Sequence, residues 1–350
     1  MGKQTTILIC GIGIAAAALL IAWNSHSGLF YKSSYTIGLV YMPARAFHEY
    51  ANKVLIDQIK ADRRFTIKEF TAASGYDPVL MATTCNEAIE SDADILITTG
   101  IQPSQGIAQA SQRRCSNKPV IFFGILDPVK NGIIDSREKP GKNMTGIESN
   151  SSGNNEFLVS DLLLIAKPNT KKILLPYAIA AGGNEEYVRA IEKSVKKQGL
   201  SITLLPIDTT SEVMAKVATL LPGHDVLMYL EGDAIAVYGT AFGKLASQHG
   251  ITLFAGSIDG MDDAALIYTS DPASLAKTAF GMAKEVLLNN KNPASMQIQQ
   301  AIVERNLVIN THLCQEQDLG NINIKKIIEK IRADNALAAV HDHIKVRNIS

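Results

Sequence analysis

The chain has 350 residues, of which 46% are hydrophobic and 19% charged, and its 34 basic and 34 acidic side chains give a formal net charge of +0. This ordinary globular composition argues against a disordered chain. Lys and Arg are scattered along the sequence. The clustered positive charge that binds phosphate backbones is therefore absent, and we expect no nucleic-acid partner.

The N-terminus has the features of an export or anchoring segment. Lys3 precedes an uncharged, mainly apolar run from Gln4 to Trp23. The run is intermediate in length between a signal-peptide core and a full membrane span. We therefore interpret residues 1–28 as a signal peptide or a membrane anchor, and in the second case residues 4–23 would tether the protein to the inner membrane.

The first half of the chain alternates between strand and helix patterns. Strands are predicted at 35–40, 65–70, 95–98, 120–123 and 145–148, and helices at 47–60, 78–91 and 103–113. Pro103 is a favourable residue with which to open the third helix. Alternation at this spacing favours a parallel sheet covered by helices on both faces.

The alternation restarts after residues 142–153, which are rich in Asn, Ser and Gly. Helices are predicted at 155–166, 185–198, 211–220, 234–249 and 273–288, and strands at 172–176, 201–205, 226–229, 252–255 and 265–268. The sequence thus predicts an α/β fold with two doubly wound parallel-sheet lobes joined by a hinge.

The C-terminal segment predicts an amphipathic helix, because isoleucines at 322, 324, 327, 328 and 331 recur at helix spacing among lysines. Residues 333–346 are predicted to extend it, so that 320–350 form a helical extension. It either packs on its own domain or contacts a partner or membrane surface.

Two successive predicted strands end in small, polar loops. Thr98-Thr99-Gly100 ends the strand at 95–98, and Gly124 with Asp127-Pro128 follows the strand at 120–123. Ligands bind at the carboxyl ends of strands in open parallel sheets, which predicts a small-molecule site here. The hydroxyls and N–H groups after Thr98 lie at a helix N-terminus, where anions are favoured.

The same segments resemble a known bacterial family. Ile97 to Gln105, Phe122 to Ile133 and Pro140 to Gly146 are similar to ABC-transporter solute-binding proteins. Better understood members of that family bind aromatic amino acids and have the type I periplasmic binding protein fold. Looser matches occur at 37–40, 254–259 and 307–310.

The resemblance implies a chain that returns to the first lobe near 269–272 and leaves it again near Pro293. The first lobe would then comprise residues 35–146 plus about 270–292, and the second 147–269 plus about 293–319. The function would be the capture of a small ligand between the lobes. The resemblance implies an amino acid, with aromatic amino acids as the first candidates and branched or other small ones as the alternative. The protein would be periplasmic or otherwise extracytoplasmic, would deliver its ligand to an ABC permease, and is expected to be a monomer without cofactor or metal.

The predicted ligand-binding residues fall into three groups. The resemblance implies that the ligand carboxylate binds to the loop formed by Thr98, Thr99, Gly100, Gln102, Pro103 and Ser104. Alternatively, these residues only cap the helix that follows. Acids that follow strands of the second lobe are candidates for the ligand ammonium or for turn positions, and they are Glu231, Asp233 and Asp259. Family members often have Thr-Asp-Asn where this chain has Glu231-Gly232-Asp233, which leaves the ligand open.

Aromatic and rim residues complete the predicted site. Tyr41 and Tyr177, near strand ends in opposite lobes, are candidate walls for the ligand side chain, or cover the edge of their lobe's core. Asp127 is interpreted mainly as a residue that shapes the loop after the strand at 120–123, at the rim of the predicted cleft; this loop is called the rim loop below. Cys85 and Cys115 would belong to successive helices of the first lobe. They either form a disulfide or remain two separate buried thiols.

The sequence contains no recognised catalytic motif, and we therefore do not expect the protein to be an enzyme. Histidines occur singly at 48, 224, 249 and 312, and we interpret them as surface residues rather than general bases. Two alternatives to uptake stay open. One is a membrane-anchored sensor that uses the same clamp, and the other is an enzyme in the cleft between the lobes.

Overall fold

The computed structural model describes residues 34–43, 46–72, 77–149, 162–179, 184–230, 234–259, 261–300, 305–310, 312–313, 324–333 and 344–349. The chain divides into two compact units, Met1–Tyr35 and Thr36–Ser350. The second contains nearly all of the described residues. Within the described ranges no helix has the length and apolarity needed to cross a membrane. The predicted signal or anchor segment lies outside them.

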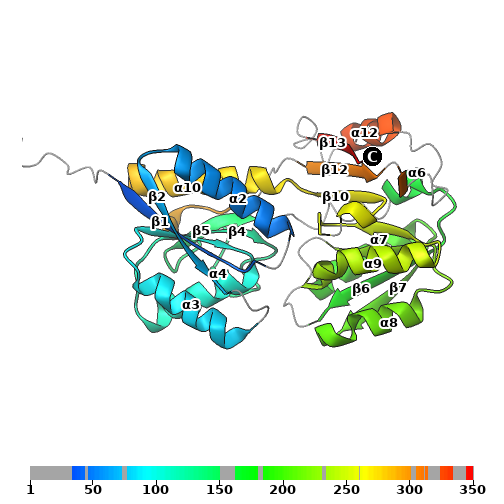
Figure 1. Ribbon diagram of the computed structural model, residues 1–350, viewed down its shortest axis with the longest axis horizontal. Helices are drawn as coiled ribbons and strands as arrows, with labels where there is room; N and C mark the ends of the chain where they lie inside the picture. Colours follow the sequence, from blue (N-terminus) through cyan, green and yellow to red (C-terminus); the bar gives the residue numbers. More distant parts are fainter. Residues whose placement is uncertain are drawn as a thin grey trace, which may run out of the picture. The chain divides into compact units, whose positions relative to one another are not determined.

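The first sheet has six strands in the order β11-β5-β4-β3-β1-β2. They are β1 (Tyr35–Tyr41), β2 (Phe65–Thr71), β3 (Ile95–Thr99), β4 (Val120–Ile125), β5 (Met144–Glu148) and β11 (Gln299–Gln300). Strand β3 is parallel to both β1 and β4. Figure 1 shows α2 (Ala46–Ala61) and α10 (Pro272–Asn289) on one side of this sheet, and α3 (Pro78–Glu90) and α4 (Ile101–Arg113) on the other.

The second sheet has seven strands in the order β13-β12-β10-β9-β8-β6-β7. They are β6 (Lys172–Ala178), β7 (Ser201–Ile207), β8 (Val226–Tyr229), β9 (Thr252–Ala255), β10 (Leu266–Ser270), β12 (Arg305–Asn310) and β13 (Ile344–Ile349). Its helices are α6 (Leu163–Ala166), α7 (Asn184–Lys197), α8 (Val213–Leu220), α9 (Gly239–Gln248) and α12 (Ile324–Ala333). Strand β12 runs antiparallel to β10, whereas β6, β8, β9 and β10 are parallel. The predicted α/β fold with two doubly wound lobes is confirmed.

The start of α4 differs from the prediction. The helix begins at Ile101, after the N-cap Gly100 with φ 87°. Pro103 therefore lies inside the first turn, where its missing N–H leaves no helical hydrogen bond unmade. Two other predicted helices, at 211–220 and 234–249, begin with 3₁₀ turns at Thr210–Glu212 and Ala234–Tyr238. Of the helix predicted at 155–166, the described part is α6.

The C-terminal prediction is partly wrong. Helix α12 confirms a helix in the isoleucine-rich stretch, but Ile344–Ile349 forms strand β13, parallel to β12. The first four residues of this strand, Ile344 to Arg347, alternate between β-branched and basic side chains. This period of two suits a strand that completes the hydrogen bonds of an exposed sheet edge.

The second departure from the first lobe also comes later than predicted. Gln299 and Gln300 pair with Ile147 and Glu148 of β5, and the hydroxyl of Thr145 donates to the carbonyl of Met296 at 2.7 Å. The chain therefore still belongs to the first sheet well beyond Pro293.

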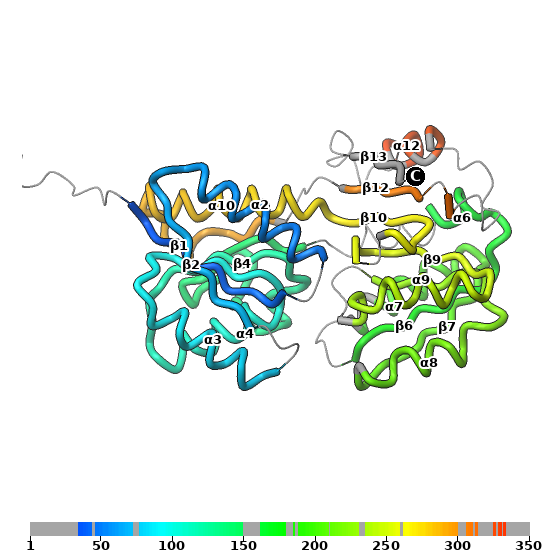
Figure 2. The backbone as a smooth tube through the Cα atoms, in the orientation of Figure 1, coloured from blue at the N-terminus to red at the C-terminus, as the bar shows by residue number. Residues whose placement is uncertain are grey.

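The passage from β10 into α10 has no linker. In Figure 2 the chain leaves the second sheet along β10 and continues directly into α10, and only Asp271 separates Ser270 from Pro272. Asp271 is 1% exposed, and its carboxylate accepts from the N–H of Ala273 at 3.2 Å and from Nδ2 of Asn306 at 3.3 Å. It thus caps α10 and holds the helix start to β12.

Asp77 provides a matched comparison for Asp271, because both are N-caps followed by proline. The carboxylate of Asp77 accepts from Val79 and Leu80, and its side chain is exposed. Asp77→Ala is expected to lower the free energy of unfolding by about 1 kcal/mol. Asp271→Ala is expected to cost about 2–3 kcal/mol, because it also leaves the buried amide of Asn306 without this acceptor. Urea unfolding of both variants measures the difference, and equal losses would contradict the role of Asn306.

Candidate ligand-binding site

Both sheets have the same topology around their central strands. The order 2-1-3-4-5 recurs as β2-β1-β3-β4-β5 and as β7-β6-β8-β9-β10. In the first sheet the chain passes from β1 to β2 on one side of β1 and then to β3 on the other side. In the second sheet it passes in the same way from β6 to β7 and then to β8. Such switch points, at the carboxyl ends of the strands, are where open α/β sheets bind ligands.

Several predicted site residues lie at these two switch points. Tyr41 ends β1 and Thr99 ends β3, while Tyr177 is near the end of β6. Glu231 and Asp233, after β8, lie outside the described residues. The topology therefore brings predicted residues to one edge of each sheet, and their contact with a ligand stays a prediction.

The hydroxyls of the loop after β3 are used inside the first lobe. The side chains of Thr98, Thr99 and Ser104 are at most 1% exposed. Ser104 donates to the carbonyl of Gly100 at 2.7 Å, and its Oγ lies 2.7 Å from Oγ1 of Thr98. Thr99 donates to Oδ1 of Asn52 at 2.6 Å. These hydroxyls tie β3 to α2 and α4 and do not cap α4, whose N-cap Gly100 has no side-chain hydrogen bond.

The other two residues of that loop have different surroundings. Pro103 is buried, and its carbonyl lies 3.8 Å from Sγ of Cys85. Gln102 lines a hollow of about 200 Å³ between α3 and α4, together with Met42, Asp77, Met81 and Arg113. Cys85 and Cys115 are both free thiols. Burial raises the pKa of Cys85 to about 12, so this thiol stays protonated at neutral pH.

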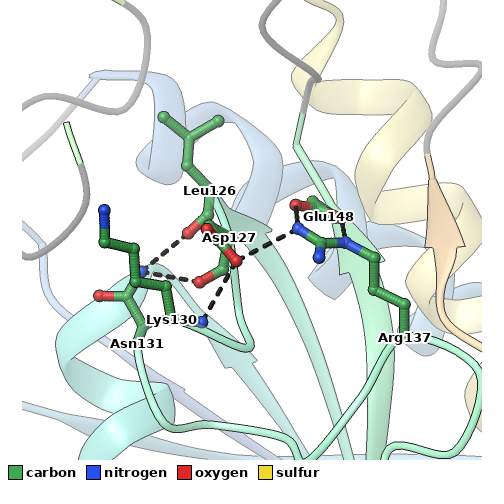
Figure 3. A network of polar contacts seen from close by, with 6 residues as sticks. All are labelled: Leu126, Asp127, Lys130, Asn131, Arg137 and Glu148. Carbon is green, nitrogen blue, oxygen red and sulfur yellow. Dashed lines mark hydrogen bonds and ion pairs between the residues drawn. The ribbon is translucent and has the colours of Figure 1, made fainter. Parts of the chain in front are cut away.

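Asp127 belongs to a charged network behind the rim loop (Figure 3). Its Oδ1 accepts from the N–H of Lys130 and from Nη2 of Arg137, both at 3.2 Å, and its backbone has φ 43°. Arg137 also makes two hydrogen bonds of 2.7 Å to the carboxylate of Glu148. These bonds, and the nearby negative charge, raise the pKa of Arg137. The contacts favour the interpretation of Asp127 as a residue that shapes the loop.

The two tyrosines are anchored to their own lobes. The hydroxyl of Tyr41 donates to Oε2 of Glu69 on β2 at 2.8 Å. Burial, together with this bond and the charge of Glu69, raises the pKa of Tyr41 to about 12. Tyr177 is half-buried against the core of the second lobe. Both interpretations made from the sequence, a ligand wall and a cover for the core edge, remain open.

Asp259 is the one predicted acid of the second lobe that the structure describes. It is 5% exposed, and its Oδ2 accepts from the hydroxyl of Ser257 at 2.6 Å. Its Oδ1 accepts from the backbone N–H of Phe47, in the first turn of α2, at 3.4 Å. The hydroxyl of Tyr229 donates to the Asp259 carbonyl. The carboxylate is therefore held in a fixed place beside a helix N-terminus.

Sequence reasoning missed His48 and Asn52 on α2. His48 is half-buried rather than at the surface, and a Cβ atom at Gly100 would lie 2.8 Å from its Cε1. Asn52, one helical turn later, is 2% exposed. The available signal was their spacing of four residues, which puts both on one helix face, next to the buried Phe47, Ala51 and Leu55.

Comparison with known proteins gives one family. Residues 57–330 match the model of a family described as ABC transporter substrate binding protein. A tyrosine-binding protein of Clostridioides difficile (strain R20291) is 26% identical over 238 residues, which is 66% of this chain and 66% of that protein, just under two thirds of its length.

Solved structures share the fold at low sequence identity. A conserved domain protein from Vibrio cholerae has a TM-score of 0.71 at 19% identity, over 89% of this chain and 100% of that one. An ABC domain from Streptococcus pneumonia, in complex with L-Trp, has a TM-score of 0.71 at 17% identity, over 88% and 100%. These likenesses show the fold of type I periplasmic binding proteins.

Proposed function

The chain belongs to the ABC transporter substrate binding protein family, and on this premise we propose that it captures an aromatic amino acid and delivers it to the permease of an ABC transporter. The observation that carries the proposal is the pair of matching switch points, each with candidate binding residues at its edge. The tyrosine-binding relative and the L-Trp complex support an aromatic amino acid as the ligand.

The chemistry of the described residues supports a zwitterion. Asp259 provides a fixed carboxylate for an ammonium group, and Tyr41 and Tyr177 provide aromatic surfaces. A ligand that bridges both lobes would favour the closed arrangement, because only that arrangement makes all of its contacts. Gln102, Asp127 and the acids Glu231 and Asp233 remain further candidates for contact.

The family is one of binding proteins, and its members are extracytoplasmic. We propose that this chain is not an enzyme and that residues 4–23 direct its export or anchor it at the membrane. A sensor function is the weaker alternative, because part of the tail that suggested it pairs with β12 of the second sheet.

A thermal-shift screen of the full-length chain in mild detergent tests the function. Only L-tyrosine or L-tryptophan among the amino acids is expected to give a large, saturable shift, worth about 2.7 kcal/mol at a hundred times the Kd. Asp259→Asn should weaken it, since the amide lacks the charge that attracts the ammonium. Sugars and nucleosides are the control ligands, and a shift with one of them but with no amino acid would refute the proposal.

A further inference from the structure

The hydroxyl donors of the loop after β3 are used inside the first lobe, whereas the first turns of α2 carry a separate set of hydrogen-bond donors. We propose that the ligand carboxylate binds at this end of α2, to the backbone N–H of Phe47, the imidazole of His48 and the side-chain amide of Asn52. The inference rests on the proposed function, because it assumes an amino-acid ligand. It assigns the carboxylate to a different element from the Thr98 to Ser104 loop.

Asn52 provides the first observation. Its Oδ1 accepts from Thr99, but its Nδ2 has no hydrogen-bond partner among the described residues, although the side chain is 2% exposed. A buried amide donor without an acceptor is costly, and such groups in native proteins call for an explanation. A ligand oxygen could be the missing acceptor, because Asn52 is bonded to Thr99 at the end of β3 and so lies at the β1/β3 switch point.

His48 provides the second observation. Its ring lies close to Gly100, which follows β3 and has φ of 87°, and to Gly124, which lies within β4 and has φ of 71°. A Cβ atom at Gly124 would be 3.5 Å from Nε2 of His48, and one at Gly100 would overlap the ring. The two glycines therefore let the imidazole approach the backbone at the carboxyl edge of the sheet, on the same helix face as Asn52.

Asp259 provides the third observation, because its carboxylate already lies at this helix terminus. Its Oδ1 accepts from the N–H of Phe47 at 3.4 Å. The terminus thus receives the same chemical group that an amino acid carries, as the partial positive charge of a helix N-terminus favours. A zwitterion inserted here replaces this one contact with two, its carboxylate on α2 and its ammonium on Asp259.

The test compares ligands that differ only in the carboxylate. Binding of L-tyrosine and tyramine, and of L-tryptophan and tryptamine, is measured by calorimetry with the full-length chain. Asn52→Asp keeps the side-chain shape and the acceptor for Thr99 but places a negative charge where the donor was. We expect it to lower the affinity for the amino acids at least about tenfold and the affinity for the amines much less. His48→Leu should act in the same direction.

Matched variants separate this site from its rival. Asn289→Asp on α10 and His249→Leu after α9 make the same chemical changes at exposed positions, and the preference for the amino acid over the amine should not change. Thr98→Val tests the loop. Circular dichroism verifies folding, and His48→Leu decides the matter should Asn52→Asp fail to fold.

Each outcome has one meaning. Loss of the preference in the α2 variants, with retention in Thr98→Val, supports the inference. Retention in both α2 variants, or loss in Thr98→Val alone, overturns it while amino-acid binding itself stands. Failure of the unmodified chain to bind either amino acid overturns the proposed function, and the inference with it.

Discussion

Replacement of Arg137 by alanine is expected to lower the free energy of unfolding by about 3 kcal/mol, because the carboxylate of Glu148 would remain buried without its cation. The Glu148 side chain is 8% exposed, and the Arg137 guanidinium holds it through two hydrogen bonds of 2.7 Å. Arg137 also contacts Asp127 at 3.2 Å. Urea denaturation at neutral pH, where Arg137 is charged, measures the loss.

An exposed pair of the same length provides the control. Arg189 and Glu185 on α7 are 2.7 Å apart, but their side chains are 67% and 63% exposed. Arg189→Ala should therefore lower the free energy of unfolding far less than Arg137→Ala does. Glu148→Leu combined with Arg137→Met should cost less than Arg137→Ala alone, because neither charge is then left unpaired. A loss in Arg137→Ala no larger than that of Arg189→Ala would show that the network is only a surface feature.

The position of Arg137 gives its network a structural role beyond the single ion pair. Its backbone carbonyl accepts from the N–H of Ile298 at 3.0 Å, just before β11, and its side chain binds Glu148 at the end of β5. Strands β5 and β11 are neighbours, with Gln300 opposite Glu148. Arg137 therefore holds the end of β5 to the start of β11, and these are the two strands after which the chain leaves the first sheet.

Local patterns were sufficient to predict most of the fold. Buried apolar runs such as Val226–Tyr229 and Thr252–Ala255 are bounded by turn residues, and they form strands with the predicted bounds. The errors arise where distant partners decide the structure. Residues 344–349 form a strand because the edge of β12 is available, and residues after Pro293 stay with the first lobe because β5 pairs with them.

The site was harder to predict for the same reason. Thr99 follows a strand and looks available in the sequence, but its hydroxyl is bound to Asn52, 47 residues earlier. His48 looked isolated because Gly100 and Gly124, the residues it lies against, are far from it in the chain. A sequence pattern shows which groups reach the sheet edge, whereas only the packing shows which of them already have partners.

Gly239→Ala is expected to have the second large effect, and it links packing to the proposed binding role of Asp259. Gly239 is the first residue of α9, and an added Cβ would collide with the carbonyl of Asp259 and lie 2.9 Å from the hydroxyl of Tyr229. That hydroxyl donates to the same carbonyl. Backbone atoms cannot move aside as a flexible side chain does, so we expect a loss of about 3 kcal/mol in the free energy of unfolding.

Gly281→Ala is the matched control, and its effect should have the opposite sign. Gly281 lies within α10, and a Cβ there has no neighbour within 4 Å. Alanine is favoured over glycine inside a helix by about 0.5–1 kcal/mol, so this variant should gain stability. Ligand titration of both variants adds the functional comparison: displacement of Asp259 should weaken amino-acid binding in Gly239→Ala and leave Gly281→Ala unchanged. A Gly239→Ala protein that is stable and binds normally would mean that the segment around Asp259 yields easily, and a carboxylate held so loosely could not fix the ammonium of a ligand.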